Sequence, residues 1–240
     1  MIPARVHLAT IGSAIVDRAG NSWSLRPQGR LVPQACVALD DLAAAVRKAG
    51  GKFALNQIWR SHEEQVALRT KYEAGTGAAA QRPGTSAHQG GRAIDVSTTT
   101  IAFPVAADQQ IDRLWELAKP LGWRPCIDRP DETASERWHL DFWSDWEPVR
   151  ARRGYTEAAM CAVLDIGEAG QATKAWGADG ALTRCVQAHL HRTGFDCGAI
   201  DGAWGARSMA AAKAAGLTGD RAQMAKDAIR LASSTTTKWS

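Results

Sequence analysis

Two short segments of the chain alternate apolar and polar residues, a pattern typical of β-strands with one buried face. In the segment 92–96, Asp95 points away from the apolar side, and in the segment 138–143, His139 and Asp141 do the same. The apolar residues of the opposite faces are Ile94 and Val96 in the first segment and Trp138, Leu140 and Phe142 in the second. The sequence therefore predicts two strands that each present side chains able to bind a metal.

A third such side chain comes from the loop before the first strand. His88 is followed by Gly90 and Gly91, which allow the backbone to take up positive φ or to approach another segment closely. Two imidazoles and one carboxylate form the ligand set of a catalytic zinc ion, with a fourth position left for water. We therefore predict that His88, Asp95 and His139 bind one Zn²⁺.

Glu136 lies three residues before His139, where the second strand begins. A zinc ion lowers the pKa of water and polarises a carbonyl group, and hydrolysis then needs a base beside that water. A carboxylate at this position can accept the proton of the water and return it to a leaving amine. Glu136 is the predicted catalytic base.

The remaining patterns up to residue 150 mix helices and short strands without a regular βαβ repeat. This mixture favours an α+β domain built on a central antiparallel sheet. The predicted elements are helices over 34–50, 62–75 and 109–123, a strand over 53–59, and a long loop over 76–91.

Beyond residue 150 only helical patterns follow. The predicted organisation is a catalytic domain over 1–150, a polar and basic linker over 151–157, and a small all-α domain over 158–240. The helical patterns lie within 156–167, 182–194, 206–217 and 220–232, and a polar tail ends the chain.

Composition limits the partners and the location of the protein. Of the 240 residues, 45% are hydrophobic and 22% charged, which is a globular composition. The net charge of +4 is not concentrated in a basic tract, so nucleic acid is not an expected partner. The first residues lack the pattern of a secretory leader, and no stretch suits a membrane span. We expect a monomer made in the cytoplasm, with no membrane insertion.

Five cysteines are present, and none forms a CxxC pair, so a thiolate zinc site is not expected. Most are expected to be buried apolar residues. Cys185 and Cys197 are close enough in sequence for a disulfide, and both the paired and the free state remain open.

The motifs around the predicted ligands resemble those of the zinc D-alanyl-D-alanine carboxypeptidase family, which includes the L-alanyl-D-glutamate endopeptidases of phage endolysins. The motif SxHxxGxAxD matches Ser86, His88, Gly91, Ala93 and Asp95, and ExWH matches Glu136, Trp138 and His139. The resemblance covers roughly residues 30–147. It implies that His88, Asp95 and His139 bind zinc and that Glu136 is the base.

The family also has an upstream Arg followed by Ser and a downstream Gln, matched by Arg60, Ser61 and Gln65. Trp59 stands where another aromatic residue, usually Tyr, is expected. The resemblance gives Arg60 a catalytic role, either stabilising the oxyanion or holding a substrate carboxylate. It makes Gln65 a substrate-binding candidate.

Three further residues near the motifs are candidates. Ser86 either binds substrate or orients its loop, and Trp138 of the ExWH motif is a candidate substrate contact. Asp141, on the same strand face as His139, either orients that ligand from behind or is a solvated strand residue.

The C-terminal helices resemble a three-helix peptidoglycan-binding domain. The family pattern is matched by Val186-Gln187, Leu190, Gly194-Phe195, Ile200-Asp201-Gly202, Trp204-Gly205 and Ala210. Trp204 replaces the usual Phe and Ser208 the usual Thr. The alternative is an ordinary small helical bundle with an Asp-Gly turn.

Together these resemblances imply a peptidoglycan hydrolase of the phage endolysin type, with L-Ala–D-Glu as the expected scissile bond. The alternatives are a D-Ala–D-Ala carboxypeptidase of wall maturation and a catalytically inactive wall-binding protein. Without a leader, the enzyme is expected to reach the wall from the host cytoplasm after holin-type release.

Overall fold

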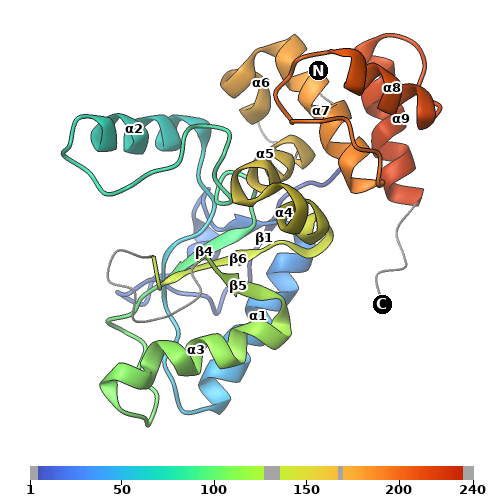
Figure 1. The fold of residues 1–240 in the computed structure, drawn as a ribbon. Coiled ribbons are helices and arrows are strands. Elements are labelled where there is room, and N and C mark those ends of the chain that lie inside the picture. Colours follow the sequence, from blue (N-terminus) through green and yellow to red (C-terminus); the bar gives the residue numbers. More distant parts are fainter. Residues whose placement is uncertain (1–4, 127–135, 167–169, 235–240) are drawn as a thin grey trace. The chain divides into compact units, whose positions relative to one another are not determined.

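The computed structural model describes residues 5–126, 136–166 and 170–234 (Figure 1). Its contacts divide the chain into two compact units, which are described separately. The sheet unit consists of Leu8–Ser61 and Ala87–Ser144, and the helical unit of Met1–His7, His62–Ser86 and Asp145–Ser240. Within the described residues, no helix is both long and apolar enough to cross a bilayer.

The sheet unit is built on a four-stranded antiparallel sheet. Its strands, in spatial order, are β3 (Leu55–Gln57), β4 (Ala93–Val96), β6 (His139–Phe142) and β5 (Trp123–Pro125). The strands β1 (Ala9–Thr10) and β2 (Arg30–Leu31) form a separate antiparallel pair. The helices of this unit are α1 (Pro33–Lys48) and α3 (Gln110–Ala118). The predicted α+β class with a central antiparallel sheet is confirmed.

The two predicted strand faces are also confirmed. Ile94 on β4 is paired with Leu140 on β6, and both side chains are fully buried. Asp95 is paired with His139, one residue along, and therefore lies on the opposite face of the sheet. The helices α1 and α3 pack against each other, and α3 also packs against β5 (Figure 1).

The helix α1 forms because apolar residues recur at helical spacing and are buried, as at Leu39, Leu42 and Val46. It ends where predicted, because Gly50 takes up a positive φ of 80° and Gly51 N–H donates to the carbonyl of Val46 at 2.9 Å.

The helix predicted over 109–123 is shorter than expected. It ends at Ala118, a 3₁₀ turn follows, and Gly122 at φ 88° turns the chain into β5. Trp123 is fully buried against Phe142, with ring centroids 5.3 Å apart, so tertiary packing makes this residue part of a strand.

The described helices of the helical unit are α2 (His62–Glu73), α4 (Glu147–Arg153), α5 (Tyr155–Asp165), α6 (Gln171–Trp176), α7 (Ala178–Arg192), α8 (Ala206–Ala214) and α9 (Arg221–Ser234). The central helix α7 packs against α5, α6, α8 and α9. The helical character predicted for the C-terminal part is confirmed, and α6 is an additional helix.

The predicted linker is helical. Residues 151–157 lie in α4 and α5, separated only by Gly154, and Arg153 donates to Glu157 across that junction at 2.6 Å. This ion pair joins the end of α4 to the first turn of α5. The contact units also place His62–Ser86 with the C-terminal helices, so the predicted division at residue 150 stays a prediction.

Arg5, near the N-terminus, is held in the helical unit by a group of buried and half-buried charges. Arg5 pairs with Asp165 at 2.5 Å and with Asp145 at 2.6 Å, and Arg192 pairs with Asp145 at 2.7 Å. Trp146 donates its indole N–H to Asp165 at 3.1 Å. These bonds compensate the carboxylate of Asp165, which is fully buried and would be costly to bury alone.

The cysteines of the helical unit are free. Cys161, Cys185 and Cys197 are buried thiols, so the open question on Cys185 and Cys197 is answered in favour of the free state. Burial raises the pKa of both these thiols to about 12, which makes them unreactive.

His189 of α7 is buried beside Trp146, with ring centroids 5.5 Å apart, and neither ring nitrogen has a hydrogen-bond partner among the described residues. Burial lowers its pKa to about 4. Below the unfolded-state pKa of about 6.5, the unfolded chain binds more protons than the folded one, so stability falls as the pH drops towards 4.

We predict that His189→Leu removes this contribution, which is on the order of 3 kcal/mol between pH 6.5 and 4. Urea unfolding at a series of pH values should show a smaller acid loss of stability in the variant than in the wild type. The exposed His7 provides the control variant, His7→Leu. Equal acid sensitivity in His189→Leu and the wild type would contradict the prediction.

Candidate metal centre

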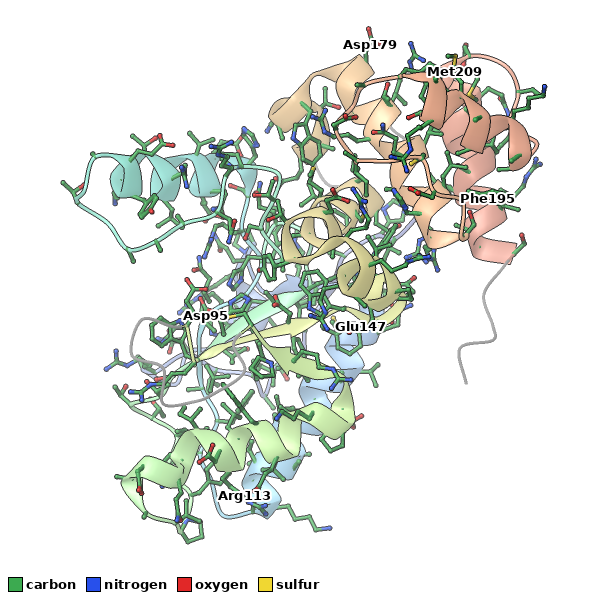
Figure 2. All side chains as sticks on the ribbon, in the orientation of Figure 1. Asp95, Arg113, Glu147, Asp179, Phe195 and Met209 are labelled. Carbon is green, nitrogen blue, oxygen red and sulfur yellow. The ribbon has the colours of Figure 1, made fainter. Side chains whose placement is uncertain are left out.

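The pairing of β4 with β6 brings two of the predicted ligands together. Asp95 and His139 are direct partners in the antiparallel register, and Val96 N–H donates to the carbonyl of Trp138 at 2.9 Å. Directly opposed residues have their Cβ atoms about 5 Å apart. In the structure, His139 Nδ1 lies 3.0 Å from Asp95 Oδ1. The side chain of Asp95 is labelled in Figure 2.

The turn before β4 brings in His88. Gly91 has a φ of 65°, a backbone conformation that favours glycine over residues with a Cβ atom. Gly91 N–H donates to the carbonyl of His88 at 3.2 Å, and its own carbonyl accepts from Val32 N–H at 3.0 Å. This turn places His88 Nε2 3.3 Å from Asp95 Oδ1.

The three side chains form one compact donor set. One donor atom each of His88, Asp95 and His139 lies within 4.8 Å of the others, and both imidazoles are buried. The two rings meet edge to face, with centroids 5.0 Å apart. Two imidazole nitrogens and one carboxylate oxygen suit a zinc ion, so the residues fit the predicted metal.

The second nitrogen of each imidazole is bound by the protein. His88 Nδ1 lies 2.5 Å from the carbonyl of Ile58, and His139 Nε2 lies 2.8 Å from Asp141 Oδ1. Both acceptors require an N–H, so the lone pairs of His88 Nε2 and His139 Nδ1 are directed at the donor set. Asp141, which is 1% exposed, thus takes the orienting position and not that of a solvated strand residue.

The charges around the set favour a cation. Burial alone would raise the pKa of Asp95, but the adjacent His88 and His139 outweigh it and hold this pKa well below its usual range. Burial alone would lower the pKa of His139, but Asp141 and Asp95 outweigh it and raise this pKa well above its usual value. Two carboxylates thus flank one imidazole, an arrangement that positive charge stabilises.

Arg60 lies beside the donor set, as predicted. Its backbone N–H donates to the carbonyl of His88 at 3.3 Å, and its guanidinium donates to Gln57 Oε1. The side chain is 8% exposed. Burial lowers the pKa of His88, and the charge of Arg60 acts in the same direction.

Glu136 and Trp138 lie where the chain enters β6. Glu136 is exposed, and its carbonyl accepts from His139 N–H at 2.8 Å, so a tight turn joins the two residues. Trp138 is 38% exposed, in contrast to the fully buried Leu140 on the same strand face. Both side chains are accessible, as their predicted catalytic and substrate-binding roles require.

Ser86 and Gln65 belong to the helical unit, and both are buried. Gln65 donates its side-chain amide to the carbonyl of Gln81 at 2.7 Å. This bond fastens the loop after α2. The predicted contact of Gln65 with substrate stays a prediction. Burial favours the loop-orienting alternative for Ser86, and its binding role stays a prediction.

Two contributions to the centre were not predicted from the sequence. The carbonyl of Ile58 orients His88, and the side chain of Gln57 binds Arg60. Both residues precede the recognisable Arg60-Ser61 pair, and backbone carbonyls leave no residue-type signal. The proximity of Gln57 depends on a strand irregularity that the sequence pattern does not show.

Comparison with known proteins gives a family match. Residues 28–145 match the family model described as VanY, D-alanyl-D-alanine carboxypeptidase. A solved structure of a mutant of the vancomycin resistance D,D-pentapeptidase VanY, from a VanB-type resistance cassette and in complex with Zn(II), is 21% identical. That match covers 57% of this chain and 78% of the other, with a TM-score of 0.38. No curated protein matches the chain.

The matched segment contains the whole donor set, together with Arg60, Glu136 and Asp141. Through this segment, the chain is similar to the family described as VanY, D-alanyl-D-alanine carboxypeptidase.

Proposed function

We propose that the protein is a zinc peptidase that cleaves an amide bond in the stem peptide of peptidoglycan. The observation that carries the proposal is the buried donor set, with each imidazole oriented from behind by an acceptor. His88 Nε2, Asp95 Oδ1 and His139 Nδ1 would hold the metal. When bound, zinc polarises the scissile carbonyl and lowers the pKa of a water molecule.

Glu136 moves the proton in this proposal. Its carboxylate accepts a proton from the attacking water and passes it to the nitrogen of the leaving amine. The turn that links Glu136 to His139 holds the base at the rim of the donor set, and its exposure leaves room for substrate.

Arg60 supplies positive charge on the side of His88. The guanidinium either stabilises the oxyanion that develops from the scissile carbonyl or pairs with a carboxylate of the stem peptide. A loss in kcat on substitution of Arg60 indicates the first role, and a rise in KM indicates the second.

Two scissile bonds are candidates. We propose L-Ala–D-Glu, as in the endopeptidases whose motifs the chain resembles, and the setting of a phage endolysin that acts on the host wall. The second candidate is the D-Ala–D-Ala bond, which the description of the matched family favours. An inactive wall-binding protein is disfavoured, since it would have no need of the complete donor set with its orienting partners.

We further propose that helices α7, α8 and α9 bind peptidoglycan. Support comes from Gln187, whose buried amide lies within 3.1 Å of acceptors on Asp201, Ala203 and Ser208. Gly202 N–H also donates to Gln187 Oε1 at 3.0 Å. The motif residues Gln187, Asp201 and Gly202 are therefore joined by hydrogen bonds between α7 and the turn before α8. A wall-binding segment would raise the local concentration of the enzyme on an insoluble polymer.

Glu136→Gln should lower the rate of wall hydrolysis by about 10²- to 10⁴-fold, because it removes the base and keeps the size of the side chain. Zinc content should stay at the wild-type level, because Glu136 is not in the donor set. Mass spectrometry of the muropeptides released by the wild type identifies the bond: new D-Glu N-termini indicate L-Ala–D-Glu cleavage, and loss of one alanine indicates D-Ala release.

The matched control is Glu116→Gln, an exposed glutamate on α3 that pairs with Arg113, and it should cleave like the wild type. A wild-type protein that binds no zinc and releases no product would contradict the proposed function.

Asp141→Ala should weaken zinc binding by about 10- to 100-fold, because His139 loses the acceptor that fixes its orientation. Asp141→Asn retains an acceptor oxygen and should lose less. Competition with a chromogenic chelator measures both affinities, with the exposed Asp112→Ala as the control. Equal zinc affinity in all four proteins would show that Asp141 does not orient the ligand.

Gln187→Ala should weaken retention on insoluble peptidoglycan in a chain that also carries Glu136→Gln, so that the wall is not digested. Zinc content should be unchanged, because Gln187 lies in the helical unit. Cosedimentation measures the effect, and Gln109→Ala, an exposed residue of the sheet unit, is the control. Circular dichroism shows whether Gln187→Ala disrupts the helical unit. If it does and the chain is still fully retained on peptidoglycan, wall binding lies elsewhere.

A further inference from the structure

A register irregularity in β3 changes which residue faces the metal centre. Leu55 is paired with Val96, and Gln57 with Asp95, so two steps along β3 match one step along β4. Asn56 is the extra residue, as in a β-bulge. In a regular ladder Asn56 would be opposite Asp95, whereas the bulge places Gln57 there. Gln57 thereby joins the sheet face that carries the donor set.

The three residues after Gln57 are held against the loop of His88. The carbonyl of Ile58 binds His88 Nδ1, the indole N–H of Trp59 donates to the carbonyl of Gln89 at 3.1 Å, and Arg60 N–H donates to the carbonyl of His88 at 3.3 Å. The backbone of Arg60 is therefore fixed relative to the donor set.

The backbone alone does not fix the guanidinium, because an arginine side chain has several rotatable bonds and high rotamer entropy. Gln57 Oε1 accepts a hydrogen bond from Arg60 Nη2 and so restricts the rotamers of this side chain. An amide oxygen is a neutral acceptor, so this bond orients the guanidinium and leaves its positive charge in place. A carboxylate in the same position would neutralise that charge.

We propose that Gln57 is a positioning residue, which holds the Arg60 guanidinium in the geometry that meets the negative charge of the substrate. This inference rests on the proposed function, because it assumes that Arg60 acts on the substrate. The bulge at Asn56 is the backbone feature that makes the contact possible.

The first test compares Gln57→Ala with Asn56→Ala, its exposed neighbour on the same bulge. Gln57→Ala should lower kcat/KM for muropeptide cleavage by about 10- to 100-fold, since a displacement near 1 Å can cost that much. Asn56→Ala should cleave like the wild type. Zinc content and the unfolding midpoint should match the wild type in both variants.

A second variant, Gln57→Met, preserves side-chain length and removes the amide group, including the acceptor oxygen. It keeps the test valid if the alanine variant unfolds. The Gln57 variants should also change the same kinetic parameter as Arg60→Ala. If Arg60→Ala lowers kcat, both Gln57 variants should lower kcat, and if it raises KM, both should raise KM. A change in the other parameter would overturn the proposal.

The double variant gives the sharpest readout. If Gln57 acts only through Arg60, then Gln57→Met should cause no further loss of activity in an Arg60→Ala background. Additive losses would overturn the proposal, as would full activity of Gln57→Met. A wild-type protein without activity would instead refute the proposed function, so the two failures are distinguishable.

Discussion

The pairing of β4 with β6 is the constraint on which the metal centre depends. Because Asp95 and His139 are opposed in an antiparallel register, two donors from residues 44 positions apart meet without any contribution from a flexible loop. A slip of one residue in either strand would turn its donor to the apolar face and bring Ile94 or Leu140 out of the core. The packing that buries these two residues therefore also maintains the geometry of the site.

The centre also depends on acceptors behind the ligands. Asp141 lies on the same strand and face as His139, two residues along, so one strand supplies both a ligand and its orienting partner. His88 has no such strand neighbour and is oriented by the carbonyl of Ile58. A substitution of Asp141 can therefore weaken the orientation of His139. The acceptor for His88 is a backbone carbonyl, so its position depends on the path of the backbone after β3.

The sequence predicted the parts of the structure that depend on local pattern. Alternation identified β4 and β6 and the faces of Asp95 and His139, and the helix predicted over 34–50 corresponds to α1. The strand β5 was missed because a three-residue strand carries too little pattern, and Trp123 continues the apolar spacing of α3. Gln65 matched a family motif, but its burial depends on how the loop after α2 folds back, which spacing does not reveal. The role of Gln57 was hidden for a related reason, since a bulge is a property of two paired strands.

The two imidazoles present different nitrogens to the metal position, and their places in the fold explain this. Nδ1 is the ring nitrogen nearer the backbone, so His139, placed directly across from Asp95, meets that short side chain with Nδ1. His88 comes from a turn outside the ladder and meets the same oxygen with its more distant Nε2. Each ring thus leaves its other nitrogen for a partner on its own side, Asp141 for His139 and Ile58 for His88. Exchange of either histidine for a shorter ligand would break both contacts at once, so the donor set and its supports form a single unit.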